Sequence, residues 1–148
     1  MNRGASLYFR RDSWIVGPLS PTETGPFVAT EPYVKMPAHV SFQELATQVR
    51  IALSDSRLIP DIDFNDPARK QTLSPILRAA GVKSWSTFYR GAKLMTIRAD
   101  DEQITLIPKM NKGARNGFSP VSGRQTLPAN STPEQLGAAL ERVFSLCQ

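Results

Sequence analysis

Residues 41–54 read SFQELATQVRIALS, and residues 132–145 read TPEQLGAALERVFS. Each stretch begins with a hydroxyl residue and carries a Glu or Gln three positions later, Glu44 in one and Gln135 in the other. This arrangement predicts two helices that each open with a capping box. Apolar residues then recur at helical spacing, so each helix has one apolar stripe to bury. Two such helices need a shared platform.

These stretches belong to a longer similarity at a constant offset, 132 − 41 = 91 residues. The identical pairs are Phe27 and Phe118, Pro37 and Pro128, Ala38 and Ala129, Leu45 and Leu136, and Ser54 and Ser145. We therefore expect an α+β fold with an antiparallel-rich sheet, helices packed on one face, and two pseudo-repeated halves. Capped amphipathic stretches are common, however, so the pattern also fits two unrelated helices.

The chain has 148 residues, enough to bury a core as a single domain without disulfides or metals. We place the two halves at about residues 6–56 and 84–147 and a linker at 57–83. Residues 17–26 contain three prolines and two glycines, which predicts a loop.

The net charge of +5 is unevenly distributed. Residues 1–66 carry six Lys or Arg and eight Asp or Glu, a balance of −2. Residues 67–148 carry twelve Lys or Arg and five Asp or Glu, a balance of +7. Such asymmetry favours a polyanionic partner or two differently charged docking surfaces, and it does not choose between them.

Two charged clusters are candidates for a binding surface. The acidic candidates are Asp55, Asp61, Asp63 and Asp66, in and before an exposed connection, and the basic candidates are Lys109, Lys112 and Arg115. The basic residues follow a hairpin predicted from the apolar runs at 93–98 and 103–108. Their Gly and Asn neighbours predict a surface loop over 109–117. The Asp spacing does not match an EF-hand loop, so we expect no metal site.

Aromatic residues are concentrated in a short helix predicted after Ser84. Trp85, Phe88 and Tyr89 fall at i, i+3 and i+4 and share one helical face. Such stripes usually pack into a core, and we expect that role here. A stacking platform for nucleic-acid bases is the alternative.

Catalytic chemistry is poorly supported by the sequence. His39 is the only histidine and Cys147 the only cysteine, and no serine motif accompanies them. A nucleophile needs a positioned base and a third orienting group. We therefore expect a protein that is not an enzyme and uses no cofactor. The N-terminus shows no signal peptide and no stretch reaches membrane-spanning length, so we expect a cytoplasmic protein with no membrane contact.

The order of several segments resembles the immunity proteins of contact-dependent growth inhibition (CDI). In the second half they are GVKSWSTFYRGAK at 81–93, a hairpin ending in Ile107 and Pro108, GFSP at 117–120, and TPEQLGAALERVFSLC at 132–147. In the first half they are Pro37, SFQELATQVRIALSDSR at 41–57, and Pro60. The resemblance covers nearly the whole chain and rests on order and spacing.

This resemblance implies a bacterial cytosolic protein that binds the C-terminal toxin domain of a cognate surface effector, one to one, and neutralises it. Many such toxins are nucleases with basic clefts, and their immunity partners are often acidic. This chain departs from that pattern by its charge of +5. The acidic cluster could meet a basic cleft, or the basic cluster could cover metal-binding carboxylates of the toxin.

A nucleic-acid-binding module is the alternative function. The basic second half and the three aromatic residues favour it. It predicts affinity that falls steeply with salt. An immunity protein instead predicts tight binding to one protein, with salt acting mainly on the association rate.

Overall fold

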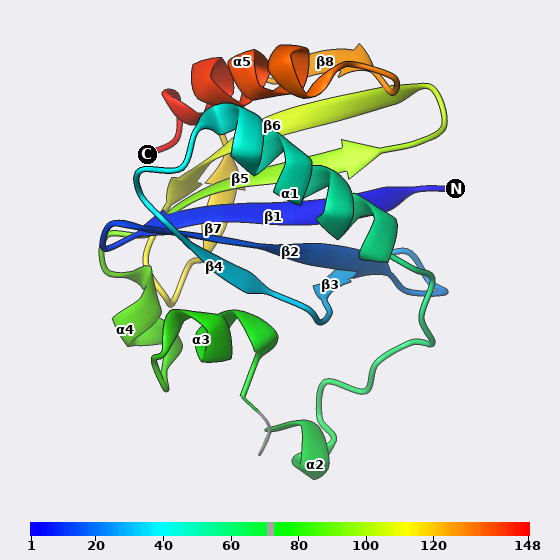
Figure 1. The fold of residues 1–148 in the computed structure, drawn as a ribbon. Helices are drawn as coiled ribbons and strands as arrows, with labels where there is room; N and C mark the ends of the chain where they lie inside the picture. The colour runs from blue at the N-terminus through cyan, green and yellow to red at the C-terminus, as the bar shows by residue number, and fades with distance from the viewer. Residues whose placement is uncertain (71–72) are drawn as a thin grey trace.

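The computed structural model describes residues 1–70 and 73–148 (Figure 1). The expected linker at 57–83 includes residues 71–72, which lie outside the described residues. In chain order the elements are β1 (Arg3–Arg10), β2 (Ser13–Pro21), β3 (Phe27–Ala29), β4 (Val34–Pro37), α1 (Phe42–Asp55), α2 (Pro67–Lys70), α3 (Pro75–Ala80), α4 (Trp85–Tyr89), β5 (Lys93–Ala99), β6 (Gln103–Asn111), β7 (Phe118–Pro120), β8 (Gln125–Pro128) and α5 (Pro133–Phe144).

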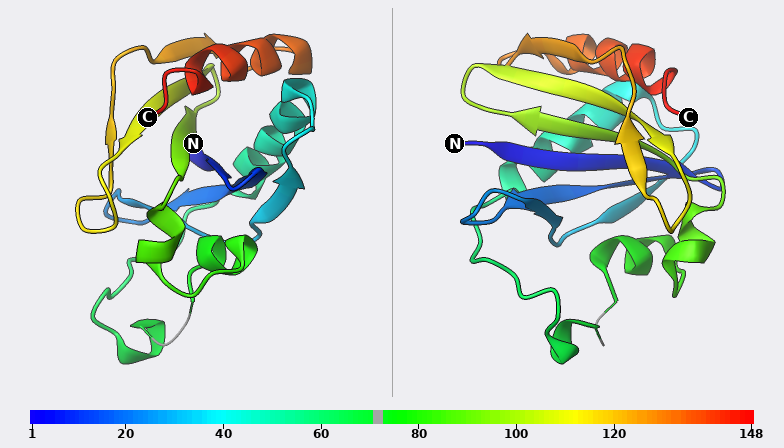
Figure 2. Two further views of the ribbon diagram at one scale, coloured as in Figure 1. Left: turned by 90° about the vertical axis from the view of Figure 1, so that its left-hand side faces the viewer. Right: turned by 180° about the vertical axis from the view of Figure 1, so that it is seen from behind.

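The eight strands form a curled antiparallel sheet whose centre is the pair β1 and β5 (Figures 1 and 2). β2 flanks β1, and β6 flanks β5. β2 then pairs with β4 along its first residues and with β3 along its last. β6 pairs with β8 and β7 in the same way. The two edges of the sheet therefore have the same construction.

The halves also match residue by residue. Adding 90 to the bounds of β2, 13–21, gives those of β6, 103–111. Adding 91 to the bounds of β3 and β4 gives the bounds of β7 and β8. The change from 90 to 91 reflects one extra residue between β6 and β7, since 118 − 111 = 7 whereas 27 − 21 = 6. The expected α+β fold with two pseudo-repeated halves is confirmed.

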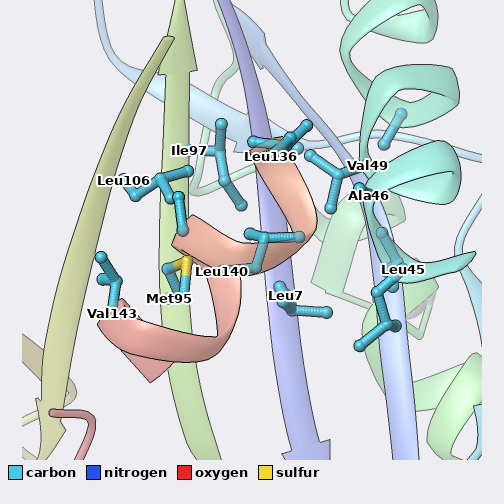
Figure 3. Packing of buried hydrophobic residues seen from close by; sticks show 14 of the residues in the cluster. Leu7, Leu45, Ala46, Val49, Met95, Ile97, Leu106, Leu136, Leu140 and Val143 are labelled. Atoms are coloured by element: carbon cyan, nitrogen blue, oxygen red, sulfur yellow. The ribbon is translucent and has the colours of Figure 1, made fainter. Parts of the chain in front are cut away.

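One face of the sheet is buried beneath the two long helices. Along β1 the side chains alternate, so Ala5 and Leu7 face α1 and α5 while Tyr8 points the opposite way. α1 lies over β1 and β2, and α5 lies over β5 and β6. In Figure 3, strand residues such as Leu7 and Leu106 meet Leu45 of α1 and Leu140 of α5. Burial of this shared apolar face is the main stabilising term of the fold.

α1 and α5 also contact each other directly. A Cβ atom placed on Gly137 of α5 would lie 3.0 Å from three backbone atoms of Phe42 and Gln43 at the start of α1. Its counterpart in α1, at 137 − 91 = 46, is the fully buried Ala46. Small residues at these equivalent positions let two helices share a platform four strands wide.

The opposite face carries a second, smaller core. Ile76 and Leu77 of α3 and Phe88 of α4 pack against Tyr8 and Ile15 of the sheet. The expectation of helices on one face therefore holds for α1 and α5, whereas α3 and α4 cover part of the other face (Figure 2). Their apolar residues lie in the expected linker and at the start of the expected second half, so the repeat pattern gave no indication of this layer.

The loop expected over residues 17–26 needs correction. Residues 17–26 are not all loop, since β2 continues to Pro21. The carbonyl oxygen of Pro18 accepts from Thr30 N at 3.1 Å, so a proline can remain in the ladder as an acceptor.

The predicted capping boxes are present in one helix of the two. At α5, Thr132 Oγ1 accepts from Gln135 N at 3.1 Å, and Gln135 Oε1 accepts from Thr132 N at 2.9 Å. At α1, Ser41 Oγ accepts from Glu44 N at 3.0 Å, but among the described residues the exposed Glu44 makes no return bond. The charged Glu44 side chain stays in solvent, where water satisfies it.

The contact at Gly137 predicts that Gly137→Ala destabilises the protein. In an open helix this change stabilises by about 1 kcal/mol. Here the new methyl group meets backbone atoms that cannot rotate away, so we expect a net loss of about 1–2 kcal/mol in urea unfolding. The control is Ala138→Gly, which changes an exposed neighbour and reports helix propensity alone. A rise in stability for Gly137→Ala would contradict the proposed close packing.

The buried phenols predict a stability that falls in alkali. Burial raises the pKa of Tyr8 and of Tyr33 above the ordinary value of about 10. A group whose folded pKa is raised stabilises the fold below its unfolded pKa, and this contribution is lost as the pH rises towards the folded pKa. Above pH ~10 we expect a loss of up to about 1.4 kcal/mol per pH unit for each phenol, measured by urea unfolding. Tyr33→Phe should flatten this slope, and an unchanged slope would refute the assignment.

Candidate functional site

The acidic cluster shapes the connection between α1 and α2. Asp61 Oδ1 accepts from both the N–H and the hydroxyl of Thr24, each at 2.9 Å. Asp63 and Asp66 each accept from the backbone N–H two residues later, at 2.9 and 3.0 Å. Asp55 stands apart from these three, at the last position of α1. The three loop carboxylates thus have a local structural role in turns and in tethering the loop.

The basic cluster is divided between a strand and a turn. Lys109 belongs to β6, so the expected loop over 109–117 begins only after Asn111. Lys112 and Arg115 are exposed in the following turn. That turn is closed by bonds from Lys112 N to Gly117 O at 2.8 Å and from Gly117 N to Gly113 O at 2.7 Å. Two cations therefore project from a closed turn, and the third lies on the sheet.

Lys109 lies among other cations. It is half-buried, and loss of solvent, followed by repulsion from Arg98 and Arg124, lowers its pKa. Within the described residues the ion pairs are the N-terminus with Asp101, at 3.7 Å, and Arg78 with Glu31. Neither Lys109 nor Arg98 nor Arg124 takes part in either of these pairs.

Arg98 is a functional candidate that the sequence analysis missed. Its guanidinium carbon lies 3.9 Å from the centre of the Phe27 ring. Its Nη1 atom is buried and makes no hydrogen bond within the described part of the chain. Arg10 offers a contrast on the same face of the sheet, since its Nε and Nη2 donate to the carbonyl oxygens of Phe88 and Thr87 at 2.9 and 3.0 Å. Arg10 is satisfied by the fold, and Arg98 is not.

A hollow of about 270 Å³ opens beside Arg98. Phe27, Arg98, Asp100 and Thr105 contribute to its wall. The Asp100 carboxylate accepts from Glu102 N and Gln103 N, at 2.8 and 2.9 Å, and these bonds lower its pKa. It is therefore held by the hairpin turn and forms no ion pair with Arg98. The hollow has space for a group from another molecule beside the Arg98 side chain.

A larger groove of about 700 Å³ lies between β3, α3 and the start of α4. Trp85, with 39% of its surface exposed, and Phe64, with 59%, are among its lining residues. The prediction that the aromatic stripe packs inward is confirmed for Phe88, which is fully buried, and wrong for Trp85. Tyr89 stacks on Phe118 with ring centres 4.8 Å apart. The stripe is thus partly core and partly the rim of a groove.

The two residues examined for catalysis are not arranged to act together. His39 is exposed in the turn before α1. Cys147 is buried, and its Sγ donates to the Leu94 carbonyl oxygen at 3.2 Å. Burial raises the pKa of this thiol, so it stays protonated at neutral pH and is a weak nucleophile.

Residues 1–70 and 73–148 contain neither a candidate metal site nor a candidate membrane span. Among them, no three His, Cys, Asp or Glu side chains are grouped so that they could hold a metal ion. In the same residues, no helix combines the length and apolar character needed to cross a bilayer.

Comparison with solved structures identifies the same fold in two bacterial proteins. One is a protein of unknown function from Neisseria meningitidis, with 16% identity and a TM-score of 0.75, over 100% of this chain and 96% of that one. The other is in a CdiA-CT/CdiI toxin and immunity complex from Yersinia pseudotuberculosis, with 20% identity and a TM-score of 0.78, over 100% of this chain and 98% of that one. At these identities the likeness concerns the fold.

Comparison with curated protein sequences gives no significant match. The family model described as CDI immunity protein, CdiI, matches residues 5–147. This match spans both halves of the sheet and both long helices. It also spans α3 and α4, which lie between α1 and α5 in the sequence. The chain belongs to the CDI immunity protein family.

Proposed function

We propose that this immunity protein binds the C-terminal toxin domain of the effector made by the same cell and neutralises it in the cytoplasm. The match to the immunity family over residues 5–147 carries the proposal. The neighbour from Yersinia pseudotuberculosis supports it, because that structure is a complex of a toxin with its immunity protein. The whole chain acts as one binding domain, with one copy per toxin.

The inhibition is stoichiometric and not catalytic. Cys147 is a protonated thiol whose Sγ already donates to a backbone carbonyl, and His39 lies in an exposed turn. Neither has the second group that nucleophilic catalysis requires. Neutralisation then depends on affinity and on the surface that is covered.

For the toxin we propose a nuclease whose metal-binding carboxylates meet the basic cluster. Lys109, Lys112 and Arg115 form no ion pair among the described residues, so they are available to a partner. The carboxylates of Asp63 and Asp66 already accept hydrogen bonds within their own loop, and that of Asp61 accepts from Thr24 in the segment between β2 and β3. These observations favour the basic cluster over the acidic one as the main docking surface.

Co-expression tests the function directly. The toxin domain encoded immediately upstream should kill cells when expressed alone, and cells that also express this protein should survive. The two chains should co-purify at a ratio of one to one. Death of the co-expressing cells without a complex would exclude the immunity function for this pair, and salt-sensitive binding to RNA or DNA would then favour the alternative of a nucleic-acid module.

Charge neutralisation tests the docking surface. We expect Lys109→Gln combined with Lys112→Gln and Arg115→Gln to weaken toxin binding at least tenfold, with a smaller salt dependence of the association rate. The matched variant changes Asp55, Asp61, Asp63 and Asp66 to Asn, which removes charge and keeps an acceptor oxygen. It should change affinity less than threefold. Calorimetry measures the affinity of each variant, and stopped-flow mixing measures its association rate. A larger loss of affinity in the Asp→Asn variant than in the Lys and Arg variant would identify the acidic cluster as the docking surface.

A further inference from the structure

The pairing of β1 with β5 creates an unusual setting for Arg98. Gly4 is the cross-strand neighbour of Arg98 in the sheet. A Cβ atom on Gly4 would lie 2.9 Å from Arg98 Nη1 and 3.0 Å from a ring carbon of Phe27. The absence of a side chain at Gly4 therefore leaves room for the guanidinium beside the Phe27 ring. In this position Nη1 is buried, while the Arg98 side chain also contributes to the wall of the hollow.

This arrangement lowers the stability of the isolated protein. Nη1 is buried without an acceptor among the described residues, and a buried unsatisfied donor is destabilising. Lys109 and Arg124 add positive charge to the same region, and no ion pair between described residues offsets them, although the Asp100 carboxylate also lines the hollow. Neighbouring like charges without a counter-ion are unfavourable unless an anion completes the site.

We propose that the hollow beside Arg98 binds a carboxylate side chain of the toxin, held by the guanidinium edge and by the positive field of Lys109 and Arg124. The inference rests on the proposed function and adds a residue and a partner chemistry to it. Planar carboxylates match the guanidinium fork through two parallel hydrogen bonds. A hollow of about 270 Å³ is large enough for one Asp or Glu side chain and too small for an extended chain segment.

A protein carboxylate fits the site better than a nucleic-acid phosphate does. Phosphate backbones are usually bound by exposed Lys and Arg spread along a surface. Here Arg98 and Lys109 are both half-buried, and one guanidinium is fixed in orientation by Phe27. Such a preorganised and partly desolvated donor is typical of the centre of a protein interface, where Arg is enriched.

Arg98→Met is the decisive variant, because it keeps an unbranched side chain on the Phe27 ring and removes the charge and the donors. We expect toxin affinity, measured by calorimetry with the purified toxin domain, to fall about thirtyfold or more. Arg98→Lys should lose at least tenfold, since a point charge cannot form the two parallel bonds. Arg142→Gln is the matched control, because this exposed Arg is on α5, against the opposite face of the sheet, and it should bind like the native protein.

Stability separates this role from a structural one. If Arg98 serves binding, Arg98→Met should melt no lower than the native protein, because it removes an unsatisfied buried donor. Should Arg98→Met fail to fold, Arg98→Lys must still fold and lose affinity. Native-like affinity in either variant would overturn the inference while leaving the immunity function intact. If the native protein itself fails to bind the toxin, the proposed function fails as well.

The interacting carboxylate can be identified by pairing Arg98→Met with single Asp→Asn or Glu→Gln changes in the toxin. At one toxin position, the loss of binding affinity should not be additive with the loss caused by Arg98→Met. Additive losses at every acidic toxin residue would contradict a direct carboxylate contact. A 20-base-pair DNA or RNA duplex that binds the native protein tightly but not Arg98→Met would instead identify the site as a phosphate site.

Discussion

The packing of two helices on one face of the β1–β5 sheet is the constraint on which the structure depends. Each half supplies a strand pair and the helix that lies over it, and the two helices also contact each other, so both apolar stripes are buried in one shared core. The close approach of Gly137 to the backbone of Phe42 and Gln43 lets both helices fit over the same four central strands. Because α1 and α5 cover this face, a binding surface on the sheet itself must lie on the opposite face or at the edges.

Part of the opposite face forms a second core, and another part carries basic residues that are proposed to bind the toxin. At one end α3, α4 and Phe118 cover Tyr8 and Ile15 and close a second core. Beyond this core the same face carries Arg98 of β5 and Lys109 of β6, which form no ion pair among the described residues. A fold that leaves a donor unsatisfied gives up some stability, which is common where a residue is retained for binding. This division is consistent with a protein that works by binding alone.

Local signals predicted the parts of the fold that are local in origin. The bond between Thr132 and Gln135 spans three residues, and the helix spacing of Leu136 and Leu140 lies within one element, so both could be read from the sequence. The Arg98 site could not, because Phe27 and Gly4 reach it only through strand pairing across more than 70 residues, 98 − 27 = 71. The continuation of β2 through Pro18 likewise depends on its neighbours, because its carbonyl is used by a distant N–H. Charge counting located the basic half, and the structure showed which of its cations lack partners.

The central claim is that the toxin covers the basic surface around Arg98 and the turn after β6. Hydrogen–deuterium exchange of the protein, alone and in complex with its toxin, tests this most directly. The backbone N–H groups of Ala114 and Arg115 make no hydrogen bond to another described residue, so they should exchange rapidly in the free protein. The account predicts that toxin slows exchange across 112–117 and 121–124. Protection confined to 57–66, with the basic turn unchanged, would contradict it.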